Sequence, residues 1–103
     1  MNIVLTQSAK EQIDYMLENK SENLQIRVSV KGFGWGGPVL GLALEESYET
    51  DTIIKQQDID FYFEESIKGY AEIIIIEYID NDYRKGFRVS YKENKDDLSD
   101  SRC

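Results

Sequence analysis

Apolar residues recur along this chain with two different periods, and the change of period separates one helix from a series of strands. Between residues 9 and 17 the apolar positions lie three or four residues apart, which predicts an amphipathic helix of about four turns. These positions are Ala9, Ile13, Met16 and Leu17. Either Thr6 or Ser8 is placed to cap this helix, and Ser8 with Glu11 has capping-box spacing. The preceding residues 3–5 form a short strand or the lead into the helix.

From residue 24 onward the period becomes two, which is typical of β-strands. Segments 24–31 and 39–46 both alternate, so we expect a hairpin whose connection is the glycine-rich stretch 32–38. Further strand patterns follow at 53–54, 59–63, 72–79 and 87–91. Segment 72–79 is apolar on both faces at its centre, which indicates a strand buried inside a sheet. One leading helix and about six strands predict an α+β domain.

The apolar pattern stops near residue 91, and this change marks the expected domain boundary. A chain of 103 residues fits one compact domain. Beyond residue 92 the sequence is polar and has no apolar periodicity, which is typical of a mobile terminus. We therefore expect residues 1–92 to form the domain and residues 93–103 to form a flexible acidic C-terminal tail.

The charge balance narrows the classes of partner. The chain carries 20 acidic and 12 basic residues, for a net charge of −8. Nucleic acids and anionic membranes are bound by clustered basic residues, so we expect neither as a partner. The longest apolar run, residues 73–76, is far shorter than the ~20 residues that span a bilayer. The N-terminus lacks the pattern of a signal peptide. These features predict a cytoplasmic protein.

The residues available for chemistry are few. The chain has no histidine, so a Ser-His-Asp or Cys-His arrangement cannot form, and we expect the protein not to be an enzyme. Asp58 and Asp60 flank Ile59, which predicts a solvated strand face and not a catalytic pair. The single cysteine, Cys103, cannot supply a four-coordinate metal site alone. It is either an unreactive thiol on the tail or a weak metal ligand shared between chains.

The glycine-rich stretch is the most distinctive local feature, and its centre is Gly34, Trp35, Gly36 and Gly37. Phosphate-binding loops lead into a helix and usually contain a lysine, whereas this stretch leads into a strand and contains none. The glycines therefore serve either a turn that needs positive φ or a close backbone approach to a ligand or second subunit. Trp35 either folds back on the domain or anchors a partner, since tryptophan is enriched at interface hot spots.

Several of these pieces together resemble one known family. A helix that opens with residues 5–9, an arginine-containing strand at 26–28 and a glycine-rich loop entering 37–44 resemble the start of HesB-like proteins. Segment 77–87, which ends in Tyr-Arg-Lys-Gly-Phe, is similar to that family's strand–turn–Gly–Phe element. The family includes the A-type iron–sulfur cluster carriers, such as the IscA proteins. The resemblance implies two small mixed β-sheets packed as a sandwich with an N-terminal helix, and a role in iron–sulfur cluster biosynthesis or iron delivery.

The ligands of those carriers are only partly present here. The carriers use one cysteine in the glycine-rich loop and two in a C-terminal Cys-x-Cys, and they usually bind the cluster between subunits. In this chain Trp35 stands in the loop and Cys103 alone stands at the C-terminus. An indole N–H cannot ligate iron. The resemblance therefore implies a divergent member without the three-cysteine site.

Because the three-cysteine site is missing, the resemblance leaves few possible cofactors and partners. Any iron or iron–sulfur cluster would be shared between chains through Cys103, and Gly34, Trp35, Gly36 and Gly37 are candidates for contact with a protein partner or a second copy. The alternative is a non-enzymatic protein- or small-ligand-binding module of the same fold with no iron–sulfur role.

Overall fold

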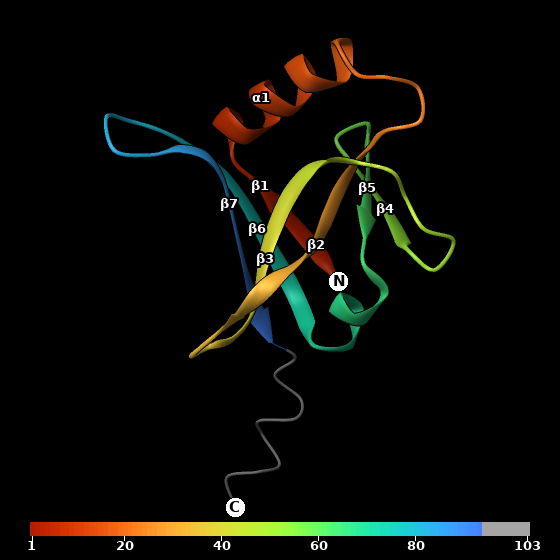
Figure 1. The fold of residues 1–103 in the computed structure, drawn as a ribbon, viewed down its shortest axis with the longest axis vertical. Coiled ribbons are helices and arrows are strands. Elements are labelled where there is room, and N and C mark those ends of the chain that lie inside the picture. The colour runs from red at the N-terminus through yellow and green to blue at the C-terminus, as the bar shows by residue number, and fades with distance from the viewer. Residues whose placement is uncertain (94–103) are drawn as a thin grey trace, which may run out of the picture.

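One helix precedes a series of strands, as the hydrophobic pattern predicts (Figure 1). The structure is a computed structural model, and it describes residues 1–93. The expected tail lies outside these residues except for Glu93, which ends the last strand. The elements are β1 (Asn2–Leu5), α1 (Gln7–Glu18), β2 (Gln25–Gly34), β3 (Gly37–Glu45), β4 (Thr52–Gln56), β5 (Ile59–Phe63), the 3₁₀ helix η1 (Glu65–Gly69), β6 (Ala71–Asp80) and β7 (Lys85–Glu93). The α+β class is confirmed.

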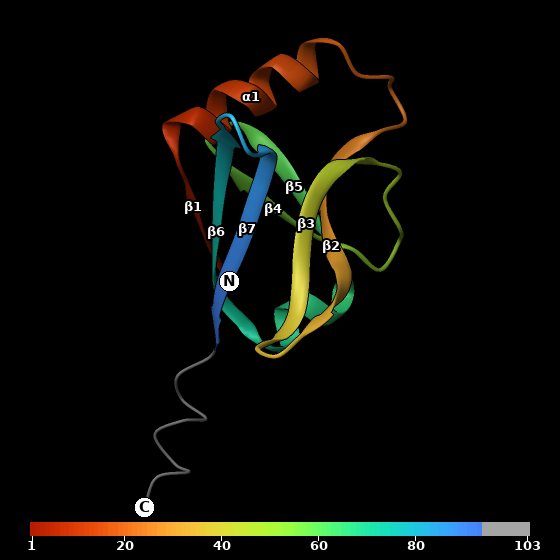
Figure 2. The ribbon, with the colours of Figure 1, turned by 60° about the vertical axis from the view of Figure 1, so that its left-hand side comes forward.

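The seven strands form one mixed sheet in the order β1-β6-β7-β3-β2-β5-β4. The expected sandwich of two separate sheets is therefore not what the structure shows. The reason is the contact between β3 and β7, where the pairing of Leu40 with Val89 joins the two halves. Because this junction is a single residue pair, the sheet bends sharply there and curls around the core (Figure 2).

The core lies on the inner face of the curved sheet, and α1 covers one end of it. The largest fully buried side chains are Phe61, Phe63, Ile13, Ile26, Ile67, Ile74, Ile76 and Val28. They come from β2, β5, β6, η1 and α1, so the core draws on both halves of the sheet. Burying one such side chain contributes roughly 1.5–3 kcal/mol. This shared core holds the two halves together more strongly than the single strand pair that joins them.

Thr6, and not Ser8, caps α1. The Thr6 Oγ1 accepts a hydrogen bond from Ala9 N at 3.3 Å, and Thr6 N donates to Ile76 O at 3.1 Å. Ser8 lies inside the helix, where its Oγ donates to Tyr78 O at 3.3 Å. The predicted capping box of Ser8 and Glu11 therefore does not form, because Ser8 is already past the helix start. Both hydroxyl residues instead fasten α1 to β6.

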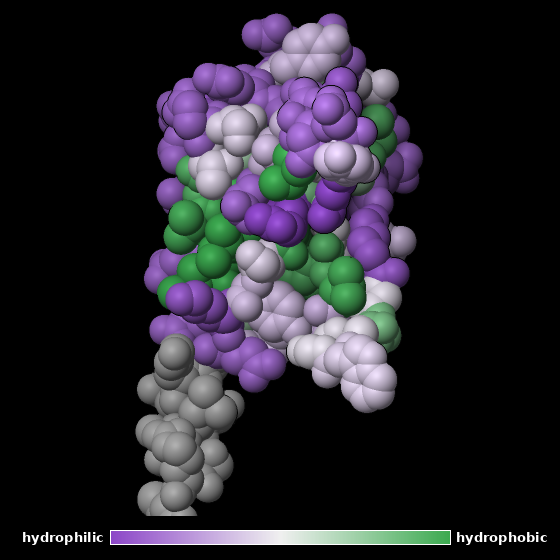
Figure 3. Space-filling model, turned by 90° about the vertical axis from the view of Figure 1, so that its left-hand side faces the viewer, coloured by the Kyte–Doolittle hydropathy of each residue, from purple (hydrophilic) through white to green (hydrophobic). Residues whose placement is uncertain are grey.

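Strand β6 is central in its half of the sheet, between parallel β1 and antiparallel β7. Its inward residues Ile74 and Ile76 are fully buried, as the sequence pattern predicts. Its outward residues Ile73 and Ile75 are only half-buried, because no second layer covers them. Figure 3 shows hydrophobic side chains gathered in the middle of one face of the molecule, between polar regions.

The expectation for Asp58 and Asp60 is wrong in one respect. Strands β4 and β5 form a hairpin whose two-residue turn is Gln57 and Asp58, both at positive φ (52° and 66°). Such values are those of a type I′ turn, which matches the twist of a hairpin. Asp58 therefore belongs to the turn and not to the strand face of Asp60. Both side chains are exposed, as expected.

The outer face of β2 carries a buried charge, Arg27, which is 7% exposed. Its Nε lies 2.8 Å from Asp51 Oδ2, and its Nη2 lies 3.0 Å from Asp51 Oδ1. Its guanidinium also stacks over the Tyr48 ring, 4.5 Å from the ring centroid. The hydrogen bonds from Arg27 lower the pKa of the Asp51 carboxyl, and this carboxylate raises the pKa of Arg27. The ion pair thus fixes the loop between β3 and β4 over β2.

We expect Asp51→Asn to lower the free energy of unfolding at neutral pH by about 3 kcal/mol, because Arg27 loses its main counterion while the side chain is buried. The folded pKa of Asp51 lies below its ordinary value of 3.8, so this contribution is present above pH 3.8. It is lost as the pH falls through the folded pKa. Urea unfolding at several pH values measures both effects. The exposed Asp82→Asn should change little at any pH, and a similar loss in both variants would contradict the prediction.

Candidate functional site

The β2–β3 hairpin is tighter than its glycine content indicates. The two strands pair as far as Gly34 and Gly37, so that only Trp35 and Gly36 remain as a two-residue turn. Most of the stretch expected to be a loop is therefore strand. A register shift between Val30 and Gly32 accommodates the extra residue in β2. We call residues Gly34–Gly37 the hairpin tip.

Gly37 explains why a glycine is required in the hairpin tip. Its φ is +111°, and a β-carbon added there would lie 3.2 Å from Tyr91 Oη. Positive φ, one of the predicted reasons for glycine, is thus met at this residue, while the predicted approach to a ligand or second subunit stays a prediction. The close neighbour is Tyr91 of β7 in the same chain. Gly36, by contrast, has no atom within 4 Å of such a carbon.

Trp35 does not fold back on the domain. Its side chain is fully exposed, and the neighbouring Phe33 is 80% exposed. Of the two alternatives for Trp35, the structure therefore shows the one in which the indole is free to meet a partner. Val39, on the first part of β3, is 50% exposed and lies on the face of the hairpin opposite to Phe33, which pairs with Pro38.

A cleft separates the hairpin tip from the end of β7. Its volume is about 470 Å³, and its lining is Gly34, Trp35, Gly36, Gly37, Pro38, Val39, Leu40, Val89, Ser90, Tyr91 and Glu93. Figures 1 and 2 both show the β2–β3 turn and the end of β7 at the end of the molecule away from α1. Because Glu93 lines the cleft, the C-terminal segment that carries Cys103 starts beside Trp35. Cys103 itself lies outside the described residues.

Tyr91 is held in place from two sides. Gly37 lies on one side of it, and on the other its ring meets the Tyr70 ring edge to face, with 5.3 Å between centroids. Aromatic pairs favour this arrangement. The Tyr70 Oη is buried and has no hydrogen-bond partner within residues 1–93. Burial raises the pKa of Tyr70, and nearby Tyr91 and Glu64 raise it further. Tyr70 therefore stays neutral and serves as packing for Tyr91.

Sequence reasoning found the hairpin side of this cleft and missed the β7 side. Val89 and Tyr91 were recognised only as alternating residues of a last strand, and Ser90 and Glu93 gave no signal. Nothing in the local pattern indicates that β7 pairs with β3. The sequence offered one hint. The last strand contains an aromatic residue, and the hairpin contains a glycine that no local feature explains.

The described residues do not fit an iron–sulfur cluster. Such clusters are held by cysteine thiolates, and the chain has one cysteine. Within residues 1–93 there is no group of three or more His, Cys, Asp or Glu side chains able to hold a metal ion. The hairpin tip presents an indole and backbone amides. Over the same residues, no helix is long and apolar enough to cross a membrane.

Two solved structures have this fold. IscA, in a crystal structure with the [2Fe-2S] cluster, superposes with a TM-score of 0.68 at 18% identity, over 86% of this chain and 84% of IscA. SufA of Escherichia coli, described as involved in the biosynthesis of iron–sulfur clusters, superposes with a TM-score of 0.70 at 14% identity, over 91% of this chain and 84% of SufA. No family model matches the sequence, and no curated protein matches it. The two structures confirm the resemblance to the HesB-like fold, although not its description as a sandwich of two separate sheets.

We expect Gly37→Ala to destabilise the protein by about 1–3 kcal/mol, because alanine is strained at this φ and its β-carbon crowds Tyr91. The Tyr91 ring resonances should shift at the same time. Gly36→Ala is the matched control and should stay within about 0.5 kcal/mol of the wild type. Urea unfolding and proton NMR measure the two effects. Equal losses in both variants would show that Gly37 has no special role.

Proposed function

We propose that this protein is a divergent, non-enzymatic HesB-like protein that acts in iron–sulfur cluster biogenesis by binding a partner protein, without a three-cysteine cluster site. The observation that carries the proposal is the fully exposed Trp35 on the hairpin tip, beside the start of the segment that bears Cys103. The fold shared with IscA and SufA supplies the link to iron–sulfur chemistry.

The exposed indole favours a binding role on energetic grounds. A tryptophan buries about 150–250 Å² at an interface, which corresponds to roughly 4–6 kcal/mol of hydrophobic free energy before the entropic cost of association. Phe33 and Val39 belong to the same hairpin and are also exposed, one on each of its faces, because Phe33 pairs with Pro38 and Val39 with Gly32. A partner that covers this surface would therefore gain a central aromatic anchor with apolar neighbours, the usual composition of a hot spot.

Iron can enter this proposal only between chains. One Cys103 thiolate from each of two molecules would contribute to a shared site, close to two hairpin tips. The proposal places the protein in the cytoplasm, where a free thiol stays reduced. The second candidate function is a protein- or small-ligand-binding module with no iron–sulfur role, and the loss of the cysteine ligands favours it.

Deletion of the gene in its host separates these two functions. We expect the deletion to lower the activity of an iron–sulfur-dependent dehydratase and to spare a cluster-independent enzyme. Wild type and Cys103→Ser should restore the dehydratase, whereas Trp35→Ala should not, because partner binding is lost. Tyr83→Ala removes an equally exposed aromatic residue from the β6–β7 turn and should restore it. Unchanged dehydratase activity in the deletion strain would exclude the iron–sulfur role and would leave the binding module as the remaining candidate function.

Anaerobic reconstitution with iron and sulfide tests the cluster site directly. We expect no visible absorbance from the purified chain, with IscA as the positive control. Absorbance that appears only in a dimer and disappears in Cys103→Ser would show a site shared between chains. Absorbance that survives Cys103→Ser would mean that residues other than the cysteine hold the cluster, which contradicts the proposal.

A further inference from the structure

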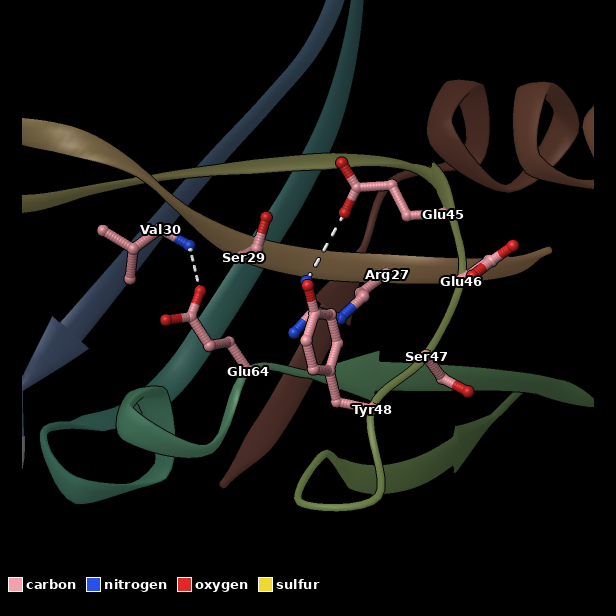
Figure 4. A pocket seen from close by; sticks show the side chains of 8 residues that line it. All are labelled: Arg27, Ser29, Val30, Glu45, Glu46, Ser47, Tyr48 and Glu64. Atoms are coloured by element: carbon pink, nitrogen blue, oxygen red, sulfur yellow. Dashed lines mark hydrogen bonds and ion pairs between the residues drawn. The ribbon is translucent and has the colours of Figure 1, made fainter.

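A second cavity lies on the outer face of β2 and shares no residue with the cleft at the hairpin tip. Its volume is about 560 Å³, within the ~300–1,000 Å³ of small-ligand sites. Its lining is Arg27, Ser29, Val30, Glu45, Glu46, Ser47, Tyr48 and Glu64 (Figure 4). The loop between β3 and β4, fixed by Asp51, forms one wall. The end of β5 supplies Glu64 on the opposite side.

The cavity carries uncompensated negative charge. Arg27 is already matched by Asp51, and Glu45 is shared between Arg27 at 3.5 Å and Lys31 at 2.8 Å. Glu46 and Glu64 have no ion pair within residues 1–93. Glu64 thus faces the cavity without a cation, and Glu46 adds negative charge at its rim, where its Oε2 accepts from Asn23 Nδ2 at 3.2 Å. An anionic ligand would be repelled and a cationic one attracted.

Two hydrogen-bond acceptors in the cavity are fixed in position and free. Glu64 Oε1 accepts from Val30 N at 2.9 Å, which orients the carboxylate and leaves Oε2 without a partner in the described part of the chain. Ser29 is 5% exposed, and its hydroxyl has no hydrogen-bond partner among residues 1–93. In Figure 4 Ser29 lies between Glu45 and Glu64. Among the buried side-chain polar atoms of residues 1–93 only Tyr70 Oη lacks a partner, so the Ser29 hydroxyl opens into the cavity, where a ligand donor can reach it.

We propose that this cavity binds the primary ammonium group of a small organic amine. An ammonium has three N–H donors and no acceptor, which matches a site of free acceptors under negative charge. Glu64 Oε2 and Ser29 Oγ each take one donor, and Glu46 adds attraction at the rim. The alkyl part of the amine packs against the Tyr48 ring, which is 66% exposed.

A metal ion fits the same cavity less well. Calcium takes six to eight oxygen ligands and magnesium demands an octahedral set, both at short distances. In residues 1–93 no three acidic side chains converge in a way that could hold a metal ion. One oxygen of Glu64 and one of Glu45 are already engaged by protein donors. The amine inference is independent of the function proposed for the hairpin tip, and either can fail alone.

An NMR titration of the ¹⁵N-labelled protein with butylammonium tests the inference, with 1-butanol as the neutral probe of the same chain length. We expect saturable amide shifts confined to Ser29, Val30, Glu64 and the loop that carries Tyr48. Butanol should produce none of them, because it lacks the charge. Shifts scattered over the acidic surface, or equal shifts with butanol, would overturn the proposal.

Glu64→Gln tests the same site by mutation. The amide oxygen of the glutamine can still accept from Val30 N. An NH₂ group, which is a donor, replaces the free carboxylate oxygen, and the negative charge is lost. We expect the affinity for butylammonium to fall at least about tenfold. Glu22→Gln removes one charge from an exposed loop and should leave the affinity within about twofold. Ser29→Ala should weaken binding of butylammonium about threefold or more. If Glu64→Gln does not fold, Ser29→Ala serves as the test of the site. Equal affinities in Glu64→Gln and Glu22→Gln would overturn the proposal.

Discussion

Strands β3 and β7 meet at Leu40 and Val89, and the candidate site depends on this contact. It joins the two halves of the sheet and brings the end of β7 beside the β2–β3 hairpin. Tyr91 then packs against Gly37, whose φ of +111° and close contact with Tyr91 Oη disfavour any residue with a β-carbon. Because one residue pair cannot hold a sheet together alone, the junction relies on the core that both halves share. Packing around Phe61, Ile74 and Ile76 thus indirectly sets the geometry of the hairpin tip.

In the hairpin tip Trp35 stands where the resemblance to HesB-like proteins implies a cysteine ligand. An indole offers area and one N–H donor, whereas a thiolate offers a metal bond. The function proposed for the tip is therefore contact with a partner. Glu93, the last residue that the structure describes, lines the same cleft as the tip.

The local elements could be predicted because each follows from the period of its own residues. The helix, the β2–β3 hairpin and the buried face of β6 are of this kind. The sequence-based predictions were wrong where one residue suits two different local structures. Thr6 and Ser8 both suit a cap, and only the contact with β6 decides between them. Asp58 suits a strand or a turn, and the two-residue connection to β4 places it in the turn.

Composition and local periodicity alone determined the α+β class, the absence of histidine, the single cysteine and the net charge, because these properties need no knowledge of contacts. Only the tertiary structure decided that Trp35 is exposed, that Tyr91 meets Gly37 and that Glu64 holds Val30 at the edge of a charged cavity. The physical reason is distance along the chain. Val30 and Glu64 are separated by 34 positions, and their meeting depends on strand register and loop closure, which no local pattern encodes.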